Sequence, residues 1–309
     1  MNFDTESDHL FYQSLRIRLI EEKVIELYPS DKIQSPVHLS IGQEAVAVGV
    51  CADLRLCDLL FGNYRGHAWY LAKGGDLKQF FAELYGKVTG CGRGKAGSMH
   101  LAAPDVGFMG SSAVVASSIP HAVGAALAAK IAKKDQVIVT VFGDGATDEG
   151  VYHESLNFAA LRKVPLIFLC ENNGLAVHST HADRQSYQIG RHAAVYGIEV
   201  HSVQEGWDPE RVREGFQTAL RRLKVSGEPQ FLEVATYRYK EHVGVGEDFD
   251  AGYRRAAQCA AWKERDPLCR DAERVARFRP ILDKEIAEAV AFAEASAWPG
   301  AEELLMHVE

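Results

Sequence analysis

Hydrophobic and polar positions alternate with several different periods along this chain. Near the N-terminus, apolar residues recur at positions 10, 17, 20, 24 and 27, which is the spacing of one helical face, and Pro29 ends the pattern. Residues 42–56 are also predicted to form a buried helix. From residue 119 to residue 238, short apolar runs alternate with helical patterns. This alternation predicts a parallel sheet with helices on both faces.

The run QVIVTVF at 136–142 is typical of a strand that is buried on both faces, and PLIFLCE at 165–171 has the same character. Further strands are predicted at 198–203 and 230–238, and helices at 119–134, 149–162, 183–195 and 208–224. A polar loop follows at 239–252. We expect an α/β, doubly wound parallel sheet in a single domain spanning 1–309: an N-terminal helical part (1–60), an α/β core (61–250) and a helical C-terminal extension (251–309).

Composition narrows the possible functions. The 309 residues carry a net charge of −8, which argues against a nucleic-acid partner, because phosphate backbones require a basic surface. None of the six cysteines forms a C-x-x-C pair, so reduced thiols are expected. The first residues are polar and acidic, and no apolar run reaches the length of a membrane span. The prediction is a cytoplasmic protein with no membrane segment.

Residues 87–118 are rich in Gly and Ser. A long stretch of this kind inside a globular protein is usually either functional or disordered. Strongly patterned segments lie on both sides of it, and this favours the functional interpretation.

Polar side chains follow two of the predicted strands. Gly143-Asp144-Gly145 comes directly after one strand, and Asn172-Asn173 ends the next. Ligands of open parallel sheets bind at the carboxyl ends of the strands, so neighbouring strands would bring these groups together. Carboxylate and amide oxygens suit Mg²⁺, which takes its other ligands from water or phosphates. A simple strand-to-helix turn would explain an isolated GDG, and the pattern does not decide between the two asparagines.

GDG followed by NN about thirty residues later resembles the magnesium-diphosphate motif of thiamine-diphosphate enzymes. The wider sequence resembles the alpha subunit of two-subunit 2-oxoacid dehydrogenases, the family that acts on pyruvate, branched-chain oxoacids or acetoin. The resemblance rests on HLSIGQEA (38–45), NYRGH (63–67), GKAGSMH (94–100), IPHAVGAALAAK (119–130), the stretch 143–173 and ATYRYKEH (235–242). It covers about two-thirds of the chain in the order of the family, and it implies the thiamine-diphosphate-binding fold.

The resemblance also implies the site. Mg²⁺ would be held by Asp144, Asn173 and the backbone oxygen of Leu175. The remaining cofactor-binding positions would be Tyr64, Arg65, Ala113, Val115, Gly143, Gly145, Ala146, Ala176 and His242. A guanidinium fits phosphate oxygens, and a phenol adds a hydrogen-bond donor. For Ala113 and Val115, only backbone contacts with the aminopyrimidine ring are implied.

His242 corresponds to the histidine of the active-site loop and is the predicted catalytic residue, since histidine transfers protons near neutral pH. His67 and His100 also lie in matching motifs and are expected to order loops. His38, His121, His153, His178, His181, His192 and His201 receive no catalytic role. Glu44 is expected to cap or pack near its helix start, because the activating glutamate of the family belongs to the beta subunit.

Some positions depart from the family pattern. Val243 replaces a serine that is often phosphorylated, which excludes kinase control at that position. Lys240 and Glu241 replace the His-Gly of pyruvate-type members, and Ser118 stands where Gln is common. These departures leave the choice of oxoacid open.

The implied function is decarboxylation of a small-molecule 2-oxoacid with thiamine diphosphate and Mg²⁺, followed by acyl transfer to a lipoyl-bearing acyltransferase. The implied partner is a beta subunit in a heterotetramer of two alpha and two beta chains. One alternative is a subunit of a split carboligase or transketolase-like enzyme without lipoyl transfer. A non-catalytic subunit is a second alternative, although the intact GDG, NN and Tyr-Arg motifs count against it. No G-x-G-x-x-G opens a helix after the first strand, which disfavours a dinucleotide enzyme.

Overall fold

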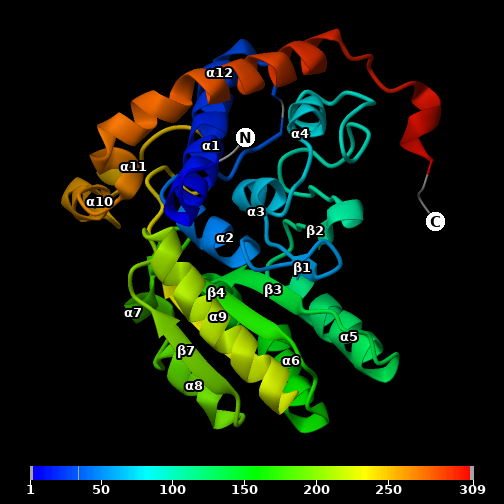
Figure 1. Ribbon diagram of the computed structural model, residues 1–309, viewed down its shortest axis with the longest axis vertical. Coiled ribbons are helices and arrows are strands. Elements are labelled where there is room, and N and C mark those ends of the chain that lie inside the picture. The colour runs from blue at the N-terminus through cyan, green and yellow to red at the C-terminus, as the bar shows by residue number, and fades with distance from the viewer. Residues whose placement is uncertain (1–2, 34, 307–309) are drawn as a thin grey trace.

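The computed structural model describes residues 3–33 and 35–306. Its centre is a six-stranded parallel sheet in the order β2-β1-β3-β4-β8-β7 (Figure 1). The strands of this sheet are β1 (Leu59–Phe61), β2 (Phe108–Gly110), β3 (Ile138–Gly143), β4 (Ile167–Asn172), β7 (Glu199–Val203) and β8 (Gln230–Ala235). The predicted α/β fold with a parallel sheet is therefore confirmed.

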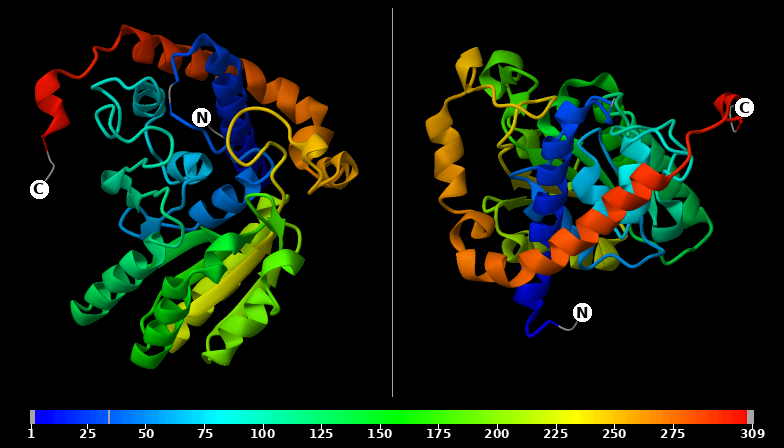
Figure 2. Two further views of the ribbon diagram at one scale, coloured as in Figure 1. Left: turned by 180° about the vertical axis from the view of Figure 1, so that it is seen from behind. Right: turned by 90° about the horizontal axis from the view of Figure 1, so that it is seen from above.

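Helices cover both faces of the sheet, and the strands explain why (Figures 1 and 2). Along β3, Val139 and Val141 enter one hydrophobic core, whereas Ile138 and Phe142 enter the other. Successive strand residues point to opposite faces, so an unbroken apolar run requires a cover on each side. The helices are α1 (Glu6–Leu27), α2 (Glu44–Cys51), α3 (His67–Ala72), α4 (Leu77–Leu84), α5 (Ser118–Ile131), α6 (Gly150–Arg162), α7 (His181–Arg184), α8 (Ile189–Val195), α9 (Pro209–Ser226), α10 (Ala256–Lys263), α11 (Pro267–Arg270) and α12 (Ala272–Ala295).

The predicted terminal helices form a layer above the sheet in Figure 1. α12 packs against α4 and α1, so the long C-terminal helix contacts helices from the N-terminal third of the chain. This arrangement confirms the helical C-terminal extension, while the predicted domain limits at 60 and 250 stay a prediction. Within the described ranges, no helix is long and apolar enough to cross a membrane.

One predicted element was wrong, and four short strands were not predicted. The single helix expected at 183–195 is two helices, α7 and α8, because Gln185 adopts an extended backbone and residues 185–188 turn away between them. An antiparallel hairpin of β5 (Leu175–Ala176) and β6 (Ser179–Thr180) precedes α7. The strands β1 and β2 were not predicted, since each has only three residues and carries little periodic signal.

The Gly-rich segment is organised by one buried side chain. The carboxylate of Glu83 on α4 accepts backbone hydrogen bonds from Gly92 (2.7 Å), Gly94 (3.0 Å), Ala96 (2.7 Å) and Gly97 (3.0 Å). Glu83 is 1% exposed, so these donors replace the water that a carboxylate would otherwise bind. The first part of the segment is thus folded around an acid that precedes it in the sequence.

Glu83→Gln is therefore expected to lower the free energy of unfolding by about 2–4 kcal/mol, because the amide NH₂ faces donors and leaves charge-assisted hydrogen bonds unmade. Urea unfolding measures this change. The matched control is Glu288→Gln at an exposed position of α12, where no change beyond about 0.5 kcal/mol is expected. Equal midpoints for the two variants would contradict the role assigned to Glu83.

Candidate active site

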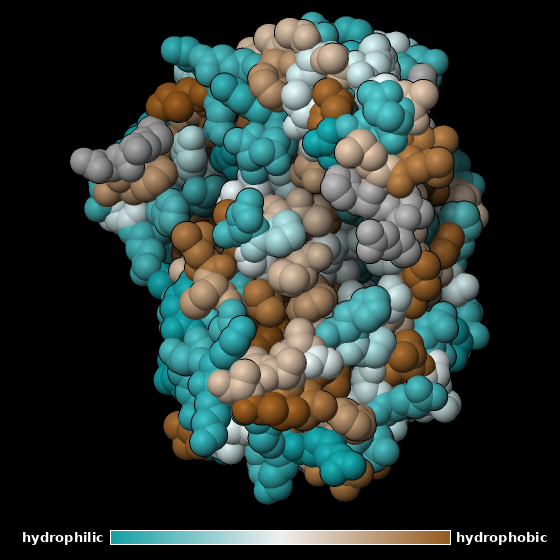
Figure 3. All heavy atoms as spheres, turned by 90° about the vertical axis from the view of Figure 1, so that its right-hand side faces the viewer, coloured by the Kyte–Doolittle hydropathy of each residue, from teal (hydrophilic) through white to brown (hydrophobic). Residues whose placement is uncertain are grey.

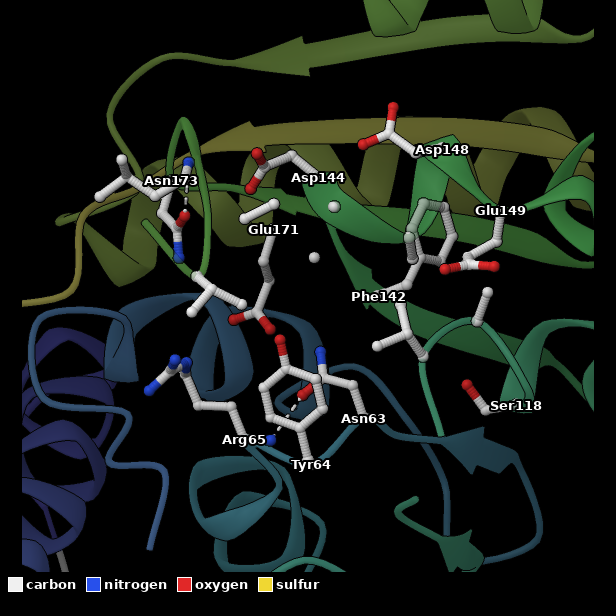
Figure 4. Close-up of a pocket in the computed structure, with 18 of the residues that line it drawn as sticks. Asn63, Tyr64, Arg65, Ser118, Phe142, Asp144, Asp148, Glu149, Glu171 and Asn173 are labelled. Carbon is white, nitrogen blue, oxygen red and sulfur yellow. Dashed lines mark hydrogen bonds between the residues drawn. The ribbon is translucent and has the colours of Figure 1, made fainter. Parts of the chain in front are cut away.

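A cavity of about 280 Å³ opens where four strands end (Figure 4). Tyr64 and Arg65 reach it from the segment after β1, and Ser112, Val114 and Ser118 from the segment after β2. The ends of β3 and β4 supply the opposite wall. The cavity therefore lies at the carboxyl edge of the parallel sheet, as the sequence predicts.

Asp144 lies at the end of β3 and is 1% exposed. Its Oδ2 accepts a hydrogen bond from the guanidinium of Arg184, and His181 Nε2 lies 3.2 Å from the same oxygen. Its Oδ1 has no hydrogen-bond partner within the described part of the chain. A buried carboxylate oxygen without a partner is costly. Oδ1 is consequently the oxygen that is free to bind a cation.

Asn173 lies just past the end of β4, and the parallel register pairs Gly143 with Glu171, so Asp144 and Asn173 are neighbours (Figure 4). Asn173 Oδ1 accepts from the backbone N–H of Leu175 (3.0 Å), and its Nδ2 donates to Gln43 Oε1 (3.1 Å). Asn172 instead donates to Glu233, outside the cavity (2.7 Å). The structure thus brings Asn173, and not Asn172, into the site.

Of the two glycines beside Asp144, Gly143 leaves room for a ligand and Gly145 allows Ala176 to approach closely. A Cβ added at Gly143 would meet nothing within 4 Å, whereas at Gly145 it would lie 2.9 Å from the Cβ of Ala176. Backbone N–H groups at such positions can approach phosphates closely. Among the described residues, no three His, Cys, Asp or Glu side chains gather to hold a metal by themselves. A hard cation bound here would need amide, carbonyl and phosphate oxygens as well, and this site fits Mg²⁺ with a diphosphate.

Tyr64 and Arg65 face this wall from the other side of the cavity (Figure 4). Arg65 is 5% exposed, and its guanidinium donates to the backbone oxygens of Leu39 (2.6 Å) and His242 (3.3 Å). Because these contacts use only part of its five-donor fork, the remaining donors are available to an anion.

His242 lines the cavity beside Tyr64, with the two ring centroids 5.6 Å apart. Burial and the nearby Arg65 charge lower the pKa of His242 to about 4. His38 packs against both rings, and burial lowers its pKa to about 3. Both imidazoles are therefore neutral at pH 7 and can accept a hydrogen bond. The sequence interpretation gave His38 no catalytic role, although the HLSIGQEA motif that contains it was among the matching motifs.

The loop that carries His242 is fixed by ion pairs. Arg238 and Arg254 both pair with Asp248, and both donate to the backbone oxygen of Lys240 (2.6 and 2.8 Å). Glu241 accepts from the backbone N–H of Gly246 (2.7 Å). Glu241 thus shapes the loop through its side chain, whereas Lys240 takes part in these contacts through its backbone oxygen. Neither side chain lines the cavity.

Glu171 is a cavity residue that the sequence interpretation missed. Its carboxyl accepts from Trp69 Nε1 (3.1 Å) and Gln43 Nε2 (3.4 Å), and burial raises its pKa to about 7. Gln43 therefore joins Glu171 to Asn173 in one hydrogen-bonded chain. Glu171 precedes the NN pair directly, but a glutamate at a strand end gives no sign of burial in the sequence alone.

The other predicted residues divide into two groups. Those that line the cavity are Val115, Gly143, Gly145, Ala146, Leu175 and Ala176. Those that do not line it are Ala113, His67, His100 and Glu44. His67 is buried between Glu21 (2.9 Å) and Ser98 (2.7 Å), and Glu44 begins α2, accepts from Gly42 N–H (2.8 Å) and pairs with Arg18. The packing role expected for Glu44 is thereby confirmed.

Comparison with known proteins shows to which family this chain belongs. The profile of the family described as "Dehydrogenase E1 component" matches residues 12–300. This chain belongs to that family. The E1 assignment confirms the resemblance predicted from the motifs, and the match includes every cavity residue as well as most of the terminal helices.

Individual E1 relatives match almost the full chain. The alpha subunit of acetoin:2,6-dichlorophenolindophenol oxidoreductase from Bacillus subtilis (strain 168) is 35% identical over 97% of this chain and 92% of its own length. The pyruvate dehydrogenase E1 component subunit alpha from Rickettsia bellii (strain RML369-C) is 34% identical over 96% and 94%. The somatic mitochondrial form from Sus scrofa is 34% identical over 98% and 80%.

The low pKa of His38 has a consequence for stability. The unfolded chain takes up a proton at this residue near pH 6.5, whereas the folded chain does so only near pH 3, so stability falls as the pH drops through this window. His38→Asn is expected to make the loss of unfolding free energy between pH 6.5 and 4.5 smaller by about 2 kcal/mol. Urea unfolding at both pH values tests this, with the exposed His121→Asn as a control for removing one histidine. Parallel losses in wild type and His38→Asn would count against the prediction.

Proposed function

We propose that this chain is the alpha subunit of a two-subunit 2-oxoacid dehydrogenase that requires thiamine diphosphate and Mg²⁺. The observation that carries the proposal is the buried, unpaired Oδ1 of Asp144 beside Asn173 and the open space at Gly143. The family match and the printed names of the relatives, which refer to acetoin and pyruvate, support the reaction class.

In this proposal Asp144, Asn173 and the Leu175 carbonyl hold Mg²⁺, and Gly143, Gly145 and Ala146 line the diphosphate. Tyr64, Arg65 and His242 contact the same group from the opposite wall. Ala176 lies beside Gly145. The backbone at Val115, which lines the cavity, is assigned to the aminopyrimidine ring, and Ala113 is assigned with it although it does not line the cavity. Thiamine diphosphate, when bound, supplies the electron sink that accepts the electron pair left as CO₂ departs. The neutral imidazole of His242 is able to accept a hydrogen bond near the reacting group.

The exposed residues at the rim of the cavity are evidence that a partner chain covers it. Four valines at its edge or next to it are exposed by 41–67%: Val114, Val115, Val177 and Val243. Apolar side chains around a polar site are typical of a surface that another protein covers. Figure 3 shows one face of the molecule, on which brown apolar patches lie among hydrophilic residues. We assign the covering partner as a beta subunit in an assembly of two alpha and two beta chains, with a lipoyl-bearing acyltransferase as the acceptor.

The carboligase or transketolase-like alternative is not favoured, because the relatives reported above are named as dehydrogenase or oxidoreductase subunits. The cytoplasmic location stays a prediction. Plant relatives are named as chloroplastic or mitochondrial, so membership of the family does not decide the compartment.

The purified chain alone is expected to show no 2-oxoacid decarboxylation with thiamine diphosphate and Mg²⁺, because it supplies only the diphosphate half of the site. Co-expression with its beta subunit should restore turnover. A panel of 2-oxoacids with a dye as electron acceptor measures this and identifies the substrate. Full activity of the isolated chain would refute the two-subunit proposal.

Asp144→Ala is expected to abolish Mg²⁺-dependent binding of thiamine diphosphate to the co-purified complex, since it removes the only carboxylate proposed as a metal ligand. Titration calorimetry with and without Mg²⁺ measures the loss. Asp105→Ala, at an exposed 3₁₀ turn, is the matched control and should bind as wild type does. Unchanged affinity in Asp144→Ala would contradict the ligand assignment.

A further inference from the structure

The turn that carries Asp144 is held by hydrogen bonds and ion pairs from a segment about forty residues later in the sequence. Four side chains after the β5–β6 hairpin reach the 3₁₀ turn Asp144–Asp148: His181, Arg184, Gln185 and Tyr187. Gln185 Nε2 donates to Thr147 Oγ1 and to Asp148 Oδ1 (2.6 Å), and the hydroxyl of Tyr187 donates to the backbone oxygen of Thr147 (2.7 Å). Arg184 donates hydrogen bonds to Asp144 itself, and His181 Nε2 lies 3.2 Å from Asp144 Oδ2 without making a hydrogen bond to it.

Arg184 contacts the turn at three acceptors. Its Nη2 donates to Asp144 Oδ2, and its Nη1 donates to Asp148 Oδ2 and, at 3.4 Å, to the backbone oxygen of Asp144. The side chain is only 12% exposed. Asp144 and Asp148 line the cavity but Arg184 does not, so the guanidinium approaches Asp144 from behind the site.

This geometry fixes the direction of the metal-binding oxygen. A carboxylate rotates easily about its terminal bond, because that torsion is broad and nearly two-fold. The bond from Arg184 to Oδ2 removes this freedom and leaves Oδ1 without a partner. Groups that orient a metal ligand from the far side commonly change metal affinity by 10- to 100-fold when they are removed.

We propose that Arg184 is the positioning residue of the cation site: it holds Asp144 by Oδ2, so that Oδ1 is presented to the metal. The inference rests on the proposed function and adds a determinant of cofactor affinity that no motif in the sequence indicated. Arg184 acts through Asp144 and takes no part in the chemistry.

The opposite interpretation is that Arg184 occupies the place of the cation and must leave before Mg²⁺ binds. The position of the guanidinium outside the cavity argues against it. So do its further bonds to Asp148 and to the backbone of Asp144, which leave Oδ1 free without any movement. The two interpretations predict opposite changes in affinity when the guanidinium is removed.

The test is calorimetric titration of thiamine diphosphate into the co-purified complex at several Mg²⁺ concentrations. Arg184→Gln is expected to raise the Kd for the cofactor by 10- to 100-fold and to raise the Mg²⁺ concentration for half-saturation. At saturating cofactor and Mg²⁺, kcat should stay within about two-fold of wild type. A general loss of structure would not raise the Kd while leaving kcat unchanged. Arg222→Gln, which removes an exposed pair with Glu199, is the matched control.

Unchanged or tighter binding in Arg184→Gln would overturn the inference while leaving the proposed function intact. If the wild-type complex itself shows no Mg²⁺-dependent binding, the proposed function fails as well. Circular dichroism establishes whether Arg184→Gln is folded. If it is not, Arg184→Lys decides: it keeps the charge but cannot reach Asp144 and Asp148 as a fork, so a smaller rise in Kd, about 3- to 30-fold, is expected. Wild-type affinity in Arg184→Lys would then overturn the inference.

Discussion

The site depends on the burial of a carboxylate that is only half satisfied. Asp144 is nearly inaccessible to solvent, and its own chain provides hydrogen bonds for Oδ2 but none, among the described residues, for Oδ1. Such an arrangement is costly for a folded protein and persists where a ligand completes it. Open space at Gly143 and the amide of Asn173 lie beside this carboxylate in the cavity, where the proposed cation would bind. The parallel sheet creates this geometry by ending β3 and β4 at the same edge.

The sequence predicted the parts of the site that follow from strand register. Two apolar runs of β-branched and aliphatic residues indicated buried neighbouring strands, and polar residues at their ends had to meet. Asp144 and the asparagine pair Asn172-Asn173 were predicted in this way to lie together. The apolar pattern could not show which of Asn172 and Asn173 enters the cavity. That choice depends on Glu233, which binds the Asn172 amide outside the cavity, and on Gln43, which binds the Asn173 amide inside it.

The residues that the sequence did not reveal act across long distances along the chain. Gln43 reaches Asn173, His38 packs on His242, and Arg184 reaches back to Asp144. Each of these residue types is common on protein surfaces, so composition and periodicity give it no distinguishing signal. The short strands β1 and β2 were missed for a related reason, because their pairing partners and not their own residues define them.

The loop around His242 shows how a sequence departure can be absorbed by the fold. Val243 has no hydroxyl group to phosphorylate, so charge cannot be added at that position to order or disorder this loop. The ordering groups are permanent instead: Asp248 binds both Arg238 and Arg254, and these two arginines hold the backbone oxygen of Lys240. Because arginine stays charged at all physiological pH values, the position of His242 beside the cavity is built into the folded chain and does not require a modification to establish it.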